Sequence, residues 1–156
     1  MNEEPNKALV RRFIDQMWNQ RQLELADQIF APDCVTHQLR GGADPTGAPR
    51  TPELVRREAE SWLAAFPDLK FEIQQMIAAE DYVVSRYTMN ATHTGTWNGV
   101  AATNKKVSVP MMTIHRIQNQ KIVEDWVLVG TLTLFQQLGL IPDTPAIIAA
   151  SAKATK

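Results

Sequence analysis

Hydrophobic residues near the start of the chain recur every three or four positions, as they do on one face of a helix. This spacing predicts a helix over residues 6–20, NKALVRRFIDQMWNQ. Its apolar stripe consists of Leu9, Val10, Phe13, Ile14, Met17 and Trp18. A second, shorter helix is expected over 22–30, QLELADQIF, ended by the APD that follows, and a short extended segment over 34–39, CVTHQL.

Proline and threonine mark the limits of a third helix. Thr51 can cap it, and Pro52 suits the first helical position. The helix must end near Phe66, because Pro67 disfavours helical geometry in the residue before it.

Beyond this helix the pattern changes to alternation of apolar and polar residues, which is typical of strands. We predict strands at about 69–79, 82–94, 106–117 and 121–130, the last two joined as a hairpin, and then a helical turn over 131–139. Helices followed by long antiparallel strands indicate an α+β fold. Its curved sheet should bury one face against the helices and leave a concave pocket for a small ligand.

Length and charge narrow the possible functions. The chain of 156 residues suits one domain, which we expect to span 1–142, with 143–156 as a loose tail. A net charge of −1 does not indicate a nucleic-acid partner. The beginning, MNEEPNK, lacks the apolar core of a secretory signal, and no apolar run reaches the roughly 18 residues of a membrane span. We therefore expect a cytoplasmic protein with no membrane partner.

One strand carries two acids among apolar residues, in the segment KIVEDWVLV, residues 121–129. Neighbouring side chains in a strand point to opposite faces, so Asp125 and Val127 share one face and Glu124 lies on the other. A carboxylate among apolar side chains has a raised pKa and can exchange a proton near neutral pH. The alternative is a structural ion pair with an arginine such as Arg86 or Arg116. Glu124 is expected to be structural.

The histidines leave alternatives open. His93 shares the more apolar face of its strand and could point inward, although the HTG that contains it precedes a turn, where histidine often satisfies backbone groups. The face of His115 depends on the hairpin register. A two-residue turn, Asn119-Gln120, would place it opposite Glu124, whereas a three-residue turn would place it opposite Val123.

Several segments, in this order and spacing, resemble the SnoaL-like polyketide cyclases of the nuclear transport factor 2-like superfamily. They are NKALVRRFIDQMWNQRQLELADQIFAPDCVTH, AAFPDLKFEI, ATHTGTWNGVAATNKKV, KIVEDW and FQQLGLIP, and the resemblance covers about residues 6–142. It implies a cone-shaped, curved antiparallel sheet closed by N-terminal helices, usually in a homodimer. It also implies aldol-type ring closure by an acid/base residue, without cofactor or metal.

The resemblance also implies positions for the site residues. The family's catalytic aspartate directly follows a tryptophan, where this chain has Val127, and the preceding histidine position holds Asp125. Because both positions share a face, we expect Asp125 to be the acid/base, about 7 Å further along the strand. His37 stands where the family frequently has a pocket histidine. With His93, it could polarise a carbonyl oxygen.

The predicted site therefore has two parts and no bound ion or coenzyme. The catalytic candidates are Asp125, His37 and His93, and the side chains expected to line the pocket are Trp18, Tyr87, Met89, Trp97, Met112 and Val127. The histidine spacing does not favour a metal site, no phosphate-binding glycine loop is present, and Cys34 lacks an activating base. The expected ligand is a small apolar or aromatic carbonyl compound. A non-catalytic binding module, a hydrolase or a dehydratase remain alternatives.

Overall fold

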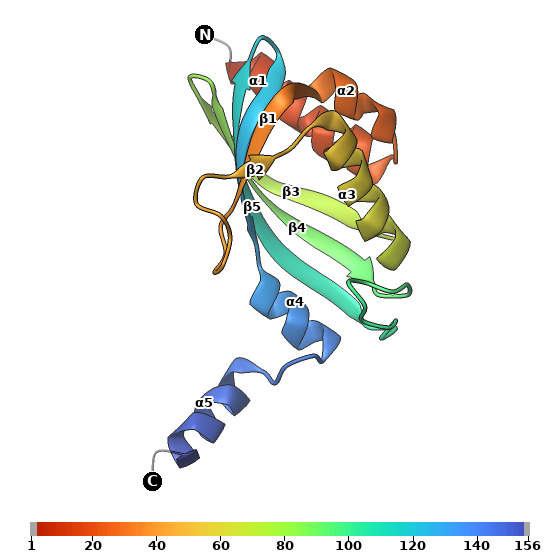
Figure 1. The fold of residues 1–156 in the computed structure, drawn as a ribbon, viewed down its shortest axis with the longest axis vertical. Helices are drawn as coiled ribbons and strands as arrows, with labels where there is room; N and C mark the ends of the chain where they lie inside the picture. The colour runs from red at the N-terminus through yellow and green to blue at the C-terminus, as the bar shows by residue number, and fades with distance from the viewer. Residues whose placement is uncertain (1–2, 155–156) are drawn as a thin grey trace.

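The computed structural model describes residues 3–154, and it confirms the α+β fold (Figure 1). Six strands form one sheet in the order β2-β1-β6-β5-β4-β3. The strands are β1 Phe30–Gln38, β2 Ala48–Pro49, β3 Lys70–Ala79, β4 Tyr82–Thr92, β5 Lys106–Gln118 and β6 Lys121–Val129. The helices are α1 Glu3–Arg11, α2 Ala26–Ile29, α3 Pro52–Ala65, α4 Thr131–Leu138 and α5 Thr144–Ala154.

The strand pairing departs from an all-antiparallel sheet at one place. β1 pairs in parallel with β6, and every other neighbouring pair is antiparallel. β1 can reach this position because the long connection through β2, α3 and the β3–β5 meander lets it meet the last strand of the sheet.

The N-terminal elements follow the predicted stripe with local changes of helix type. α1 continues as a π-helix, Arg12–Asn19, and a 3₁₀ turn, Leu23–Leu25, precedes the single turn of α2. The predicted second helix ends one residue early. The APD segment lies inside β1 instead of following the helix, because Pro32 disfavours helical backbone in the residue before it. Thr51 caps α3 as expected, its side chain accepting from the Leu54 amide.

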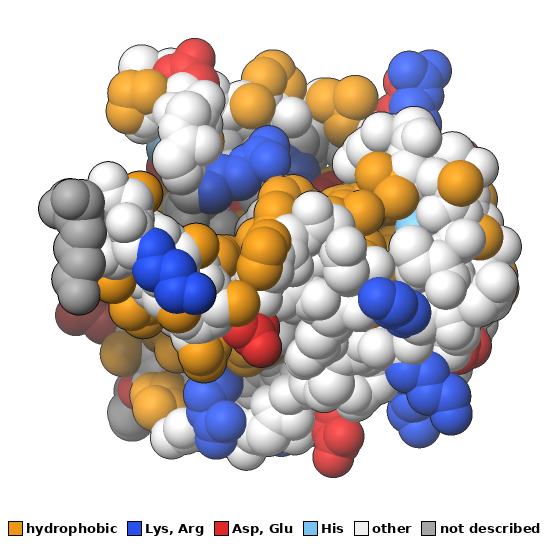
Figure 2. Space-filling view, turned by 90° about the horizontal axis from the view of Figure 1, so that it is seen from below, with side chains coloured by type: hydrophobic (Ala, Val, Ile, Leu, Met, Phe, Trp, Pro, Cys, Tyr) orange, Lys and Arg blue, Asp and Glu red, His pale blue; other side chains and the backbone are white. Residues whose placement is uncertain are grey.

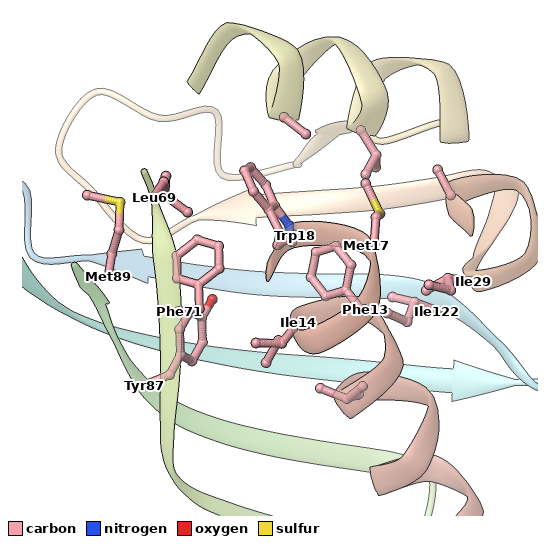
Figure 3. Packing of buried hydrophobic residues seen from close by; sticks show 14 of the residues in the cluster. Phe13, Ile14, Met17, Trp18, Ile29, Leu69, Phe71, Tyr87, Met89 and Ile122 are labelled. Carbon is pink, nitrogen blue, oxygen red and sulfur yellow. The ribbon is translucent and has the colours of Figure 1, made fainter. Parts of the chain in front are cut away.

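The π-helix brings the apolar stripe onto the concave face of the sheet (Figure 3). Phe13 packs edge-on to Phe30, and Trp18 packs edge-on to Phe71, with ring centroids 5.0 and 5.2 Å apart. α3 lies on the same side of the sheet as the π-helix (Figures 1 and 3). The core is therefore a helix layer against one face of the sheet, as the alternation predicted.

A bulge in the last hairpin decides which residues of β6 face inward. The turn has two residues, and both have positive φ, 49° at Asn119 and 59° at Gln120, as a tight hairpin turn requires. Ile117 pairs with Ile122, but Arg116 already pairs with Glu124, so one extra residue, Val123, is inserted into β6. The bulge puts both Ile122 and Asp125 on the inner face.

The segment after α4 is helical rather than irregular. α5 begins where the Asp143 carboxylate accepts from the Ala146 amide, and its alanine-rich composition favours a helix. None of the described residues of α5 is buried, and Figure 1 shows it standing away from the sheet. The outer ends of the predicted domain and tail, residues 1–2 and 155–156, lie outside the described residues. No helix of the described chain is long and apolar enough to span a bilayer.

Candidate active site

A cavity of about 560 Å³ opens between the concave face of the sheet and the helices. Its walls come from the π-helix, from α3 and α4, and from the inner faces of β1 and β3–β6. Viewed from the end where α4 and α5 lie, hydrophobic side chains gather toward the middle of the face, with Lys or Arg side chains beside them (Figure 2). This volume is within the range that holds a drug-sized ligand.

Asp125 lies in the wall of this cavity and has no exposed surface. The Thr36 hydroxyl donates to its Oδ1 at 2.5 Å, because β1 and β6 place these two residues side by side. Its Oδ2 lies 2.9 Å from Arg50 Nε. The angles of this contact are not those of a hydrogen bond, so it is an ion contact, and Oδ2 has no hydrogen-bond donor among the described residues. Thr36 therefore holds one carboxylate oxygen by a hydrogen bond, and Arg50 holds the other by charge alone.

Arg50 is the partner that sequence reasoning did not identify. Its backbone amide donates to the Cys34 carbonyl at 2.7 Å, which fixes the residue just before the cap of α3. The buried guanidinium reaches Asp125 on one side and Glu58 of α3 on the other, at 2.8 Å, and it lies over the Phe30 ring. The proposed partners Arg86 and Arg116 are not used, and Arg116 instead binds Glu124. Nothing in the sequence separates Arg50 from other arginines, because its role depends on the return of β2 along β1.

Burial and charge act in opposite directions on this pair. Burial raises the pKa of Asp125 above the ordinary aspartate value, and the Arg50 guanidinium and the Thr36 hydroxyl only partly oppose it. Burial would lower the pKa of Arg50, but the carboxylates of Glu58 and Asp125 outweigh that effect and raise it. Arg50 therefore stays charged, while Asp125 is easier to protonate than an exposed carboxylate.

His115 also lines the cavity, directly across β5–β6 from Asp125. The bulge at Val123 produces this register, which neither of the two simple turns would give. Burial, with a smaller contribution from the Arg50 charge, lowers the pKa of His115 to about 3, so its ring is neutral at neutral pH. Neither ring nitrogen has a hydrogen-bond partner among the described residues, and the ring packs edge-on to Phe13.

A second polar group on the inner face is fully paired. The Tyr87 hydroxyl and the Thr113 hydroxyl lie 2.7 Å apart across β4–β5. Burial raises the pKa of Tyr87 to about 12, so this phenol stays protonated. It adds a polar stretch to an otherwise apolar wall.

Five of the six residues expected to line the pocket are in the cavity wall: Trp18, Tyr87, Met89, Trp97 and Val127. The expectation for Met112 is corrected. Its side chain is 42% exposed on the outer face, and its neighbour Met111 lines the cavity instead. The strand pairing makes the reason clear, because Met112 stands beside Leu128 on the outer face and Thr113 beside Val127 on the inner face.

The structure does not bring His37 or His93 to Asp125 at the cavity. His37 stacks on Trp126 on the outer face, and its Nε2 lies 2.9 Å from Glu124 Oε1. Parity explains this placement, because His37 is one residue beyond Thr36, which faces inward. His93 is buried but stacks on Phe66, with its Nδ1 3.1 Å from the Thr103 hydroxyl. His93 also accepts from the Thr103 backbone amide at 3.3 Å, which corresponds to the structural alternative for that residue.

Glu124 lies on the outer face, as its parity indicated. It accepts from Arg116 Nε at 2.9 Å while it contacts His37. The hydrogen bonds from His37 and Arg116 outweigh its burial and lower its pKa.

Burial raises the pKa of Cys34 to about 12, which makes its thiol a poor nucleophile. Within residues 3–154, no group of three or more His, Cys, Asp or Glu side chains is arranged to hold a metal ion.

Comparison with solved structures gives similar chains along almost the whole length. The proposed hydroxylase AclR from Streptomyces galilaeus is 31% identical, with a TM-score of 0.77, covering 96% of this chain and 91% of AclR. The proposed polyketide cyclase IdmH from Streptomyces antibioticus is 26% identical, with a TM-score of 0.73, covering 86% of this chain and 98% of IdmH. A proposed polyketide cyclase from Acidithiobacillus ferrooxidans is 25% identical, with a TM-score of 0.75, covering 87% of this chain and 95% of that protein.

A search of curated proteins gave no significant match. The family model of the SnoaL-like polyketide cyclases matches residues 8–138, which include every strand of the sheet and the walls of the cavity. The chain therefore belongs to the SnoaL-like polyketide cyclase family.

Proposed function

We propose that this protein is an acid/base enzyme that needs no cofactor and closes or isomerises a small polyketide-like carbonyl compound, with Asp125 as the catalytic residue. The observation that carries the proposal is the position of Asp125. Its carboxylate is buried in the wall of a cavity large enough for the substrate, and one of its oxygens has no hydrogen-bond donor among the described residues.

The chemistry would proceed in two proton transfers. Asp125 removes a proton from the carbon next to a carbonyl group, and the electron pair of that C–H bond forms an enolate. The enolate carbon attacks a second carbonyl of the same molecule, and the resulting alkoxide takes a proton back from Asp125. A carboxylate whose pKa is raised by burial is a better base for this step and still returns the proton.

The site supports each requirement of this mechanism. Thr36 and Arg50 hold the carboxylate in one orientation, which reduces the entropy lost when the reacting atoms meet. Apolar side chains around Asp125, such as Val127 and Phe13, keep bulk water from the enolate. The aromatic walls formed by Trp18 and Trp97 suit a flat ring system.

Incubation of the purified protein with aromatic compounds whose two carbonyl groups are spaced for closure of a five- or six-membered ring, followed by mass spectrometry, tests the proposal. Ring closure or isomerisation leaves the mass unchanged but alters the retention time and the NMR spectrum, whereas subsequent dehydration removes one water. A hydrolase would add one water and split the compound. Compounds that bind but are never consumed would indicate a non-catalytic binding module instead.

The similarity to AclR favours one second candidate, hydroxylation of a related compound. The same carboxylate would remove the substrate proton, and the carbanion would attack one oxygen of an added hydroperoxide. The O–O bond would break, and the alkoxide that leaves would take the proton from Asp125. The mass assay separates the two activities, because hydroxylation adds one oxygen.

We propose further that the chain is a cytoplasmic homodimer. Met112 and Leu128 pair across β5–β6 on the outer face and are 42% and 45% exposed, and a neighbouring apolar surface of this kind favours association. Light scattering after size exclusion is expected to give about twice the chain mass of 17.5 kDa. The mass of a single chain at micromolar concentration would contradict the dimer.

A further inference from the structure

We propose that His115 binds the oxygen atom of the ligand, and that the cavity therefore selects an enolisable ketone or a phenol whose oxygen reaches the Asp125 end. This inference deepens the proposed function, since His115 and Asp125 lie in the same cavity wall. In this arrangement His115 donates a hydrogen bond to the ligand oxygen, and Asp125 acts as the base on the neighbouring carbon.

The first argument is the lack of any protein partner for the imidazole. Both ring nitrogens of His115 are buried, and no hydrogen-bonding atom of residues 3–154 satisfies them. Buried polar groups are nearly always hydrogen-bonded, so an unpaired side chain in a cavity wall indicates a ligand contact. The buried His93 differs, since it does not line the cavity and its Nδ1 contacts Thr103.

The second argument is that the hydroxyl groups near Asp125 are hydrogen-bonded and the nearby guanidinium is paired with carboxylates. Thr36 donates to Asp125, and Arg50 lies between the carboxylates of Asp125 and Glu58. The Tyr87 and Thr113 hydroxyls bond to each other. Arg50 Nε has no hydrogen-bond acceptor among the described residues, but it lies 2.9 Å from Asp125 Oδ2, so among these groups His115 is the one with neither a hydrogen bond nor an ion contact.

The third argument is geometry. Residues directly opposite in an antiparallel pair have Cβ atoms about 4.5–5.5 Å apart, and His115 is directly opposite Asp125. The α-carbon of a ketone and its oxygen are separated by only two bonds. One small group can therefore present a C–H to the carboxylate and the oxygen to the imidazole.

The charge state of His115 suits this role. A neutral imidazole has one N–H donor and one acceptor nitrogen. An imidazolium would pair with Asp125 and suppress its action as a base, but burial keeps the ring neutral. The N–H would stay on the ring while it donates to the enolate oxygen, and the α-proton goes to Asp125, so no other proton or electron is needed.

The test compares two probes of nearly the same shape, 2-naphthol and 2-methylnaphthalene, by NMR or calorimetric titration. The ratio of their dissociation constants reports the contribution of the hydroxyl. We expect His115→Phe to reduce the preference for 2-naphthol by about 5- to 100-fold, because the hydroxyl then loses its partner in a buried site. His115→Gln keeps a donor and an acceptor and should retain part of the preference.

A second readout is made on the wild-type protein and uses a variant only to assign signals. The chain has 3 histidines, so ¹⁵N-labelled histidine gives few ring signals, and the His115→Gln spectrum assigns those of His115. Bound 2-naphthol should shift the His115 ring nitrogens, whereas 2-methylnaphthalene should leave them nearly unchanged.

An equal preference in wild type and both variants, or unshifted His115 nitrogens when 2-naphthol is bound, would overturn the inference. Failure of wild type to bind either probe would overturn it as well. These results are separate from the fate of the proposed function. If no substrate is turned over but His115 discriminates the probes, the cavity is a binding site for such oxygen compounds without catalysis. If turnover depends on Asp125 but the probes are not discriminated, only the role of His115 fails.

Discussion

Asp125→Asn is expected to lower kcat by about 10²- to 10⁴-fold, the usual contribution of a general acid/base. The amide has nearly the same shape and can still accept from Thr36, but it cannot take the α-proton. Arg50 keeps its contact with Glu58, so we expect the free energy of unfolding to fall by only about 1–2 kcal/mol. Steady-state kinetics and urea unfolding of the same preparation measure both quantities.

The dependence of kcat on pH provides an independent check. Asp125 must be ionised to act as a base, so kcat should increase with pH through the pKa of Asp125 and then level off. Because burial raises that pKa, the midpoint should lie above the ordinary aspartate value of about 3.9.

Glu124→Gln is the matched control, since it removes the neighbouring carboxylate from the outer face and should change kcat less than about 2-fold. A loss below 10-fold for Asp125→Asn would remove this residue from the mechanism.

Arg50→Met is expected to lower the free energy of unfolding by about 3–5 kcal/mol at neutral pH, because it leaves the buried carboxylate of Asp125 without its counter-charge. Methionine keeps much of the length of the arginine stem and so limits the cavity left behind. The pKa of Asp125 should rise further in this variant. A raised carboxyl pKa gives stability that is present at low pH and lost as pH rises through it, so the deficit relative to wild type should shrink toward acidic pH.

Two variants show whether the effect comes from the buried charge. Arg116→Met breaks a partly exposed ion pair with Glu124 and should cost only about 0–1 kcal/mol. The double variant Arg50→Met, Asp125→Asn removes both charges and should recover a large part of the loss. Equal destabilisation by the single and double variants would mean that Arg50 stabilises the protein through packing alone.

Periodicity was sufficient for most of the secondary structure. The alternation after Pro67 predicted four strands close to their observed limits, and threonine and proline located the start of α3. These signals are local, since each depends on residues within one element. The helix-to-strand change at Phe30 and the helical tail after Asp143 were predicted less well, because a proline within a strand and an exposed alanine-rich segment give weak patterns.

The candidate site could be predicted only in part, for a different reason. Parity along β6 is enough to place Asp125 on the same face as Val127 and opposite to Glu124. The contact with Arg50 requires β2 to return beside β1, and the placement of His115 requires the bulge at Val123. His37 shows the same limit. It directly follows Thr36, whose side chain faces inward, so the side chain of His37 lies on the outer face. Contacts between distant segments depend on register, which a single sequence does not specify.

The extra residue at Val123 has a consequence for comparing this protein with its relatives. Counting positions forward from the hairpin turn assigns the wrong side to every residue of β6 after the bulge, whereas counting from Trp126 assigns it correctly. A relative with the same turn and the same letters around its tryptophan, but with a regular ladder in place of the bulge, would place the residue equivalent to Glu124 opposite His115 and direct a different acid toward the substrate. Site residues should therefore be transferred within the family by strand partner, as Thr36 with Asp125, and not by distance along the chain.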